Sequence, residues 1–204
     1  LGSKVLQTRS VEMGAKNSVP IQVLSSFDEE VGSALKGTLV TTEDKIVEQE
    51  VVTGIAHSRD ESKVTVVGVE DVPGVAARLF EPLAAASVNV DMIVQNISAE
   101  GRTDMTFTVP RNELDLAVRT IKEKVDLSYK EVVIDENVAK VSVVGIGMRS
   151  HVGVANKMFK TLAAKNINIQ VISTSEIKIS VLIGDDYTEL AVRALHSAYG
   201  LEEA

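Results

Sequence analysis

Apolar and polar positions follow the same order twice along most of the chain. Val64 to Val69 is a short apolar stretch typical of a buried strand, and a loop containing Pro73-Gly74 follows it. Apolar residues then recur at the spacing of one helix face, at Val75, Leu79, Leu83 and Ala86. Residues 141–159 repeat the strand, the glycine loop and the start of the helix, with two extra residues in the loop. Two copies of one unit predict tandem domains.

The pattern predicts a β-α-β-β-α-β order in the first copy, which is typical of a ferredoxin-like fold of the α+β class. Its predicted strands are 63–69, 89–97, 105–109 and 129–134, and its predicted helices are about 74–86 and 114–125. The second copy has predicted strands at 140–146, 167–173 and 177–183, with helices at about 152–165 and 187–198. Its fourth strand is missing.

An isolated strand at 50–57 has a suitable length and pattern to close the second sheet, and a polar turn at 58–62 separates it from the first copy. We therefore predict that the first unit, 63–135, is inserted in the second, which consists of 50–57 plus 138–204. Residues 42–49 are polar and form a predicted linker.

Residues 1–41 lie outside the repeat and predict a helix at 10–16 and strands at 20–24 and 37–40. A segment this short does not build its own core, so we expect it to dock on a larger domain. The chain begins with Leu1 rather than Met, from which we expect a fragment or a processed subunit.

Composition narrows the classes of function. There are 21 Lys and Arg against 29 Asp and Glu, and there is no Trp. The net charge of −8 disfavours nucleic-acid binding, which depends on a basic surface. The absence of Cys excludes disulfides and thiolate metal sites and fits a cytoplasmic protein. No apolar run approaches the roughly 20 residues that span a bilayer, so no membrane partner is expected.

The loop before the first predicted helix carries the strongest candidate chemistry. The N–H groups of Gly74 to Ala76 begin the helix, and a helix N-terminus binds carboxylates. Asp71 stands beside them and could bind an ammonium group, so together they suit a free amino acid. The alternative is purely structural, with Pro73 starting the helix and Asp71 capping a turn. The second copy has Met148 to His151 in this loop, so its site should differ.

The amino-acid sequence of the repeats resembles that of ACT domains, and in particular that of the regulatory region of aspartokinases. The resemblance rests on VEDVPG at 69–74, NVDMIVQNIS at 89–98, TDMTFTVPR at 103–111 and NINIQVISTSEIKISVLI at 166–183. Residues 2–40 resemble the last segment of the amino-acid-kinase domain of that family. The Lys-Phe-Gly-Gly motif of the catalytic body is absent from the chain.

The resemblance implies a parent enzyme that phosphorylates aspartate with ATP and magnesium and is inhibited by threonine and often by lysine. This chain alone would hold no cofactor, no metal and no complete active site. Expected partners are the amino acid effector and a second chain, as a homodimer through ACT units or as a heterotetramer with the catalytic subunit. Matched positions imply effector contacts at Asp71, Gly74, Val75, Ala76, Asn89, Val90, Asp91, Gln95, Val154, Ala155, Asn168, Ile169, Ser175 and Glu176, and a partial nucleotide contact at Lys4 and Val5.

Two other functions are possible for a protein with the predicted strand order. A pair of RNA-recognition domains would need aromatic residues on the central strands, and Val64–Val69 and Val141–Ile146 contain none. A structural dimerisation module is compatible with the sequence, and ligand titration would distinguish it from a sensor.

Overall fold

The computed structural model describes residues 5–25, 27, 37–41, 51–97, 101–145 and 153–201. The chain divides into two compact units, residues 2–51 and residues 52–204. None of the described helices has the length and apolar character needed to cross a membrane.

The described residues of the smaller unit form one helix and a two-stranded antiparallel sheet. Helix α1 spans Thr8–Lys16, and strands β1 (Ile21–Val23) and β2 (Thr38–Val40) pair with Ile21 opposite Val40. These elements match the predicted helix and strands to within two residues. Helix α1 has no buried residue, which agrees with a segment that does not form a core of its own. The predicted linker 42–49 lies outside the described residues.

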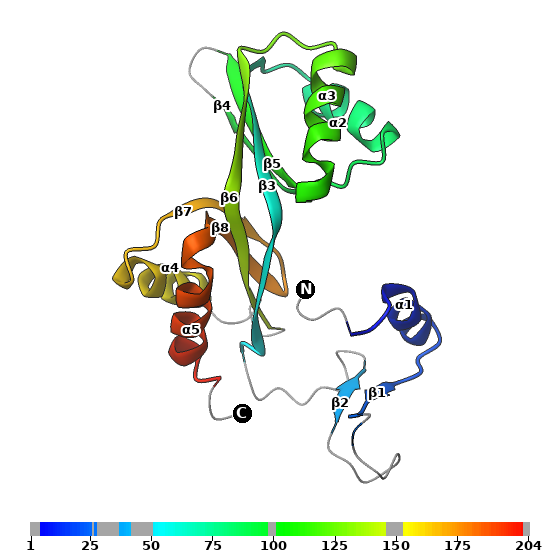
Figure 1. Ribbon diagram of the computed structural model, residues 1–204, viewed down its shortest axis with the longest axis vertical. Helices are drawn as coiled ribbons and strands as arrows, with labels where there is room; N and C mark the ends of the chain where they lie inside the picture. Colours follow the sequence, from blue (N-terminus) through cyan, green and yellow to red (C-terminus); the bar gives the residue numbers. More distant parts are fainter. Residues whose placement is uncertain are drawn as a thin grey trace. The chain divides into compact units, whose positions relative to one another are not determined.

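The larger unit is built on a six-stranded antiparallel sheet with the order β4-β5-β3-β6-β8-β7 (Figure 1). Its strands are β3 (Gly54–Glu70), β4 (Asp91–Ile97), β5 (Arg102–Val109), β6 (Glu131–Val144), β7 (Ile169–Thr174) and β8 (Lys178–Gly184). The long strands β3 and β6 pair from Gly54 opposite Val144 to Val67 opposite Glu131. They therefore run through two four-stranded lobes. The first lobe adds β4 and β5 to them, and the second lobe adds β8 and β7.

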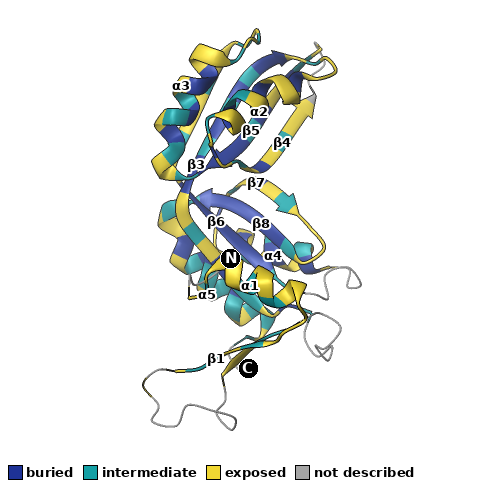
Figure 2. Ribbon diagram, turned by 90° about the vertical axis from the view of Figure 1, so that its right-hand side faces the viewer, coloured by how far each residue is buried: buried dark blue, intermediate teal, exposed yellow. Residues whose placement is uncertain are grey.

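Two helices cover one face of the sheet in each lobe. The first lobe carries α2 (Val75–Ala85) and α3 (Leu114–Lys124), and the second carries α4 (Val154–Ala164) and α5 (Thr188–Tyr199). Short 3-10 turns at Arg111–Glu113 and Asp185–Tyr187 lead into α3 and α5. The helix residues that face the sheet are fully buried, for example Leu79 and Ile121 in the first lobe and Met158 and Leu195 in the second (Figure 2).

The predicted insertion of one ferredoxin-like unit in the other is confirmed by strand pairing. Residues 54–57, at the start of β3, lie opposite 141–144 of β6 and supply the fourth strand of the second lobe. Residues 51–53, which were also predicted as strand, precede β3.

Two boundaries inside the sheet were predicted wrongly. Residues 58–62 form no turn, because they continue β3. Residues 131–134 and 140–144, which were predicted to lie in separate strands, belong to the single strand β6. The β3–β6 register shifts between Ser58 and Glu61 and again between Glu61 and Lys63. These irregularities let a polar segment stay within a continuous strand.

Candidate functional site

The N-terminus of α2 lies at the outer end of the first lobe. Gly74 precedes the helix with φ 88°, a left-handed conformation that favours glycine. The N–H of Val75 donates to the carbonyl of Val72 at 3.2 Å. This group was predicted to be available to a ligand, and that prediction is wrong. Among the described residues, the N–H groups of Gly74 and Ala76 have no acceptor. Two of the three predicted backbone donors therefore remain available for an anion.

Asp71 and Gln95 meet beside this helix terminus. Gln95 Nε2 donates to Asp71 Oδ1 at 3.4 Å, and the N–H of Asp71 donates to the carbonyl of Gly101 at 3.0 Å. Asp71 is half-buried and Gln95 is exposed. The structure thus brings together five predicted contacts, namely Asp71, Gly74, Val75, Ala76 and Gln95. They combine an acid, an amide and free N–H groups.

Asn89, Val90 and Asp91 lie at the opposite end of β4. Asp91 is opposite Thr108 and Gln95 is opposite Met105, so four strand residues, or roughly 13 Å, separate Asp91 from Gln95. The N–H of Asn89 donates to Glu113 Oε2 at 2.7 Å. The predicted contacts of the first unit therefore form two separate groups within one chain.

The second lobe repeats this division. Val154 and Ala155 begin α4 after Gly153, which has φ 104°. Ser175 and Glu176 lie in the β7–β8 turn, and a hydrogen bond of 2.9 Å from the N–H of Gly145 to the carbonyl of Ile177 ties this turn to the end of β6. The loop at Met148–His151 lies outside the described residues.

Asn168 and Ile169 stand at the start of β7, six or seven residues before the turn at Ser175. The second lobe therefore also has one group of predicted contacts near its helix terminus and turn, and another at the start of its edge strand.

The edge strands β4 and β7 lie side by side where the lobes join (Figure 2). Met92 and Val94 of β4 pack with Val138, Val171 and Leu182 in one apolar cluster. Lys63 of β3 also donates a hydrogen bond to Gln170 of β7. The open face of one lobe thus contacts that of the other, and the starts of β4 and β7 belong to this junction.

A buried charge network occupies the same junction. Lys140 Nζ lies 2.5 Å from Glu61 Oε1 and 2.9 Å from Asp91 Oδ2. Burial alone would raise the pKa of Asp91, but hydrogen bonds from Lys140 and the Met92 amide and the charge of Lys140 outweigh it, and the pKa lies below the ordinary 3.8. Burial alone would lower the pKa of Lys140, yet Glu61 and Asp91 raise it above 10.5. All three side chains are placed here by tertiary contacts.

These shifts predict how Asp91 affects stability with pH. A lowered carboxyl pKa stabilises the fold above the ordinary pKa, and this contribution is lost as the pH falls through the folded value. The raised pKa of Lys140 keeps its own contribution present at every pH below 10.5. Because the Asp91 side chain is 49% exposed, solvent screening limits the contribution to roughly 0.5–1 kcal/mol. Asp91→Asn should therefore lower the free energy of unfolding at pH 7 by that amount and by less towards pH 2, as measured by urea unfolding.

Asp126→Asn is the matched control, because Asp126 is fully exposed and lies 3.7 Å from Arg78. It should change the unfolding free energy little at any pH. An Asp91→Asn effect that is the same at pH 7 and pH 2 would contradict the role of the ionised carboxylate.

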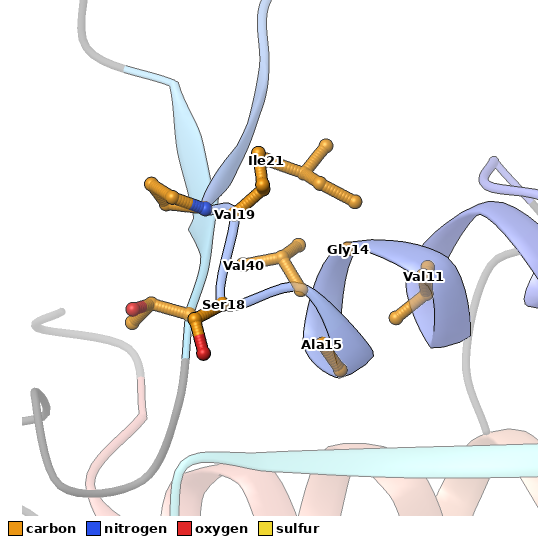
Figure 3. A pocket seen from close by; sticks show the side chains of 9 residues that line it. Val11, Gly14, Ala15, Ser18, Val19, Ile21 and Val40 are labelled. Atoms are coloured by element: carbon orange, nitrogen blue, oxygen red, sulfur yellow. The ribbon is translucent and has the colours of Figure 1, made fainter.

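The nucleotide contact predicted at Lys4 and Val5 stays a prediction. Lys4 lies outside the described residues, and the side chain of Val5 is 67% exposed. A hollow in the same unit is lined mainly by apolar side chains, including Val11, Val19 and Ile21 (Figure 3). Ser18 and Thr41 supply its polar side chains, so it carries no charged group for a phosphate. No set of three or more metal-ligating side chains occurs in the described part of the chain.

The sequence did not indicate that Glu61 and Lys140 form the charge network at the junction, or that Glu113 binds the N–H of Asn89. The one signal for Lys140 was a charged residue at the head of an apolar strand, and Glu61 was hidden in a segment interpreted as a turn. Their contacts became visible only when the strands were paired.

Comparisons with known proteins agree with this architecture. The ACT domain family matches residues 64–125 and 141–199. An aspartate kinase of Stutzerimonas stutzeri is 53% identical over 204 residues, covering 99% of this chain and 48% of that protein. The chain thus spans about half the length of the curated relatives it matches.

Two solved structures extend the comparison. A chain of the aspartokinase alpha and beta subunits matches 72% of this chain over 98% of its own length, with 51% identity and a TM-score of 0.68. The ligand-free regulatory subunit of aspartate kinase from Thermus thermophilus matches 74% of this chain over 99% of its own length, with 37% identity and a TM-score of 0.70. The matched parts, 72% and 74% of this chain, are about as long as the larger unit, residues 52–204.

Proposed function

Because this chain belongs to the aspartokinase family and carries its ACT-domain regulatory region, we propose that it senses a free amino acid, with threonine as the first candidate effector and lysine as the second. The observation that carries the proposal is the pairing of Asp71 with Gln95 beside the N-terminus of α2. The resemblance of the larger unit to a solved regulatory subunit supports it. Binding of the end product would signal feedback inhibition to the kinase.

The chemistry of the outer end of the first lobe suits an amino acid. The effector carboxylate would accept hydrogen bonds from the N–H groups of Gly74 and Ala76, where the helix dipole also favours an anion. The ammonium group would contact Asp71, and the amide of Gln95 would bind the side chain or the carboxylate. A hydroxyl on the effector would give the amide a partner, which favours threonine over an apolar amino acid.

A complete pocket would require two chains. Within one chain the helix termini and the starts of β4 and β7 are separate groups, as the register of β4 shows for Asp71 and Asp91. We propose that the Asp71–Gln95 group of one chain faces Asn168 and Ile169 of another. The partner would be a second copy of this chain or a catalytic aspartokinase subunit, in line with a relative whose structure holds alpha and beta subunits.

We also propose the activity of the whole protein. It would transfer a phosphoryl group from ATP to L-aspartate and form 4-phospho-L-aspartate, with magnesium bound to the nucleotide. The catalytic groups would belong to the part of the relatives that this chain does not match. We therefore expect no aspartate-dependent ATP turnover from this chain alone, and robust turnover would refute that assignment.

Isothermal titration calorimetry of the purified chain tests the sensor. L-Threonine, L-lysine and L-methionine should be titrated separately, with D-threonine as the control for stereospecific recognition. We expect saturable L-threonine binding with a dissociation constant below about 1 mM, equivalent to about −4 kcal/mol, and no binding of D-threonine. Absence of binding for all three L-amino acids would favour a structural dimerisation module instead.

A further inference from the structure

Glu61, Lys140 and Asp91 form a three-strand network that we name the charge clasp. Glu61 lies on β3, Lys140 on β6 and Asp91 on β4. Lys140 is 8% exposed and Glu61 is 7% exposed, while both contacts of the Lys140 ammonium are at ion-pair distance. The clasp therefore links an edge strand of the first lobe to both strands that the lobes share.

The clasp coincides with three register shifts, whereas the shift of β7 against β8 between Ile169 and Val171 lies outside it. Glu61 lies between the two shifts of β3 against β6, and Asp91 immediately precedes the shift of β4 against β5. Backbone pairing alone does not specify the alignment at such irregular points. Side chains that meet only in one register can specify it instead.

Asp91 also controls the backbone of the residue that follows it. Its Oδ2 binds Lys140, and its Oδ1 accepts a hydrogen bond from the N–H of Met92 at 2.8 Å. Met92 has φ 48°, which is uncommon for a residue other than glycine. This turn directs the Met92 side chain into the apolar cluster between the lobes, where it is 3% exposed.

Other groups near the carboxylate do not replace Lys140. Thr108 lies opposite Asp91, but its buried hydroxyl has no hydrogen-bond partner in the described part of the structure. Lys178 attracts Asp91 through charge only, and Lys63 is engaged by Asp135 at 3.5 Å and by Gln170. Lys140 is therefore the cation that holds Asp91 in place.

A stabilising role alone is a weak explanation for this arrangement. Removing charges from water is costly, and replacing a buried ion pair by apolar residues is often neutral or stabilising. The location at the start of β4, next to Asn89 and Val90, indicates a positional role instead.

We infer that Lys140 is a positioning residue for amino acid binding, which it supports by clasping Asp91 to Glu61 and so fixing the segment 89–92 at the lobe junction. The inference rests on the proposed function. Lys140 itself does not contact the effector. It sets the conformation of the start of β4, which would face the helix terminus at Val154 and Ala155 of another chain, as the start of β7 would face the Asp71–Gln95 group.

The test uses the complete chain with Glu61 and Lys140 changed together. Glu61→Gln with Lys140→Gln removes one charge of each sign, so the net charge of the clasp stays constant. Neither buried member keeps an unpaired charge, and Asp91, whose side chain is 49% exposed, loses its cation. Lys140→Arg is the conservative variant that keeps the cation. Arg59→Gln is the matched control, because Arg59 lies on the same strand as Glu61 and forms partly exposed ion pairs with Asp185 and Glu189 that do not involve the clasp.

The first readout is independent of any effector. Amide hydrogen exchange of the peptide containing 89–97 should be at least tenfold faster in the double variant, whereas the peptide containing 114–124 should be unchanged. Arg59→Gln should match the unmodified chain in both. Unchanged exchange at 89–97 in the double variant would overturn the clasp.

The second readout is calorimetric titration with L-threonine and L-lysine. We expect the double variant to bind the effector at least tenfold more weakly and Lys140→Arg to lie within threefold of the unmodified chain. Unchanged affinity in the double variant would overturn the positioning role. If the unmodified chain bound neither amino acid, the proposed function would fail, and the exchange readout would still decide whether the clasp orders β4.

Discussion

Replacing Gln95 by alanine is expected to weaken L-threonine binding about ten- to a hundredfold while the fold survives. The amide of Gln95 is exposed, and it reaches Asp71 at 3.4 Å beside the N-terminus of α2. Loss of one hydrogen bond to a charged group costs about 1.5–3 kcal/mol, which corresponds to that loss of affinity. Calorimetry measures the affinity, and circular dichroism with thermal unfolding checks the fold.

Asn96→Ala is the matched control for this prediction. Asn96 is the next residue of β4 and is also exposed, but its neighbour across the sheet is Asp104 and its side chain points to the opposite face. Its removal should leave the affinity within about twofold. If Gln95→Ala and Asp71→Ala both bind L-threonine as tightly as the unmodified chain, the site assignment is wrong. In the complete protein, for which we propose kinase activity, Gln95→Ala should relieve feedback inhibition and leave uninhibited turnover nearly unchanged.

The largest effect on stability is expected from a truncation that begins at Glu61. This change removes residues 54–58, which pair with 140–144 of β6 and form the fourth strand of the second lobe. It also removes Val52 and Ala56, which are both buried. The apolar residues of β6 would then form a free sheet edge, which is prone to aggregation. We expect loss of several kcal/mol, a large part of the 5–15 kcal/mol that stabilises a typical domain.

A truncation that begins at Val51 is the control, because it retains all of β3 and the whole larger unit. It should remain monodisperse and unfold cooperatively. Size-exclusion chromatography and urea unfolding distinguish the two variants. A Glu61 truncation that stays monodisperse and unfolds like the Val51 truncation would show that residues 54–58 are not needed for the second lobe.

Local patterns were sufficient to predict most helices and strands. Helix α2 follows the spacing of Val75, Leu79 and Leu83, and these three residues are its buried positions. Periodicity succeeds there because each helix buries one stripe against a sheet, and the stripe repeats with the helical turn. The repeated strand-loop-helix pattern also predicted two lobes with the same fold, because similar patterns of apolar residues form similar elements.

The candidate site was predicted only as a set of residue types. The sequence placed Asp71 next to a helix terminus because these residues are neighbours along the chain. The resemblance added Gln95 and Asp91 to the same set of contacts. Nothing in the sequence showed that Asp91 lies about 13 Å from Gln95 on the same strand. That separation depends on strand direction and register, which local periodicity does not specify.

By itself, the sequence determined the lobes and the faces that become buried, because these follow from periodicity and repetition over short distances. The family was indicated by specific motifs that resemble it. Only the tertiary structure decided that residues 58–62 continue β3, that β6 serves both lobes, and that Lys140 meets Glu61 and Asp91. A polar stretch is compatible with a turn or with an irregular strand. The choice depends on the partner strand and on whether its buried charge finds a counter-ion there.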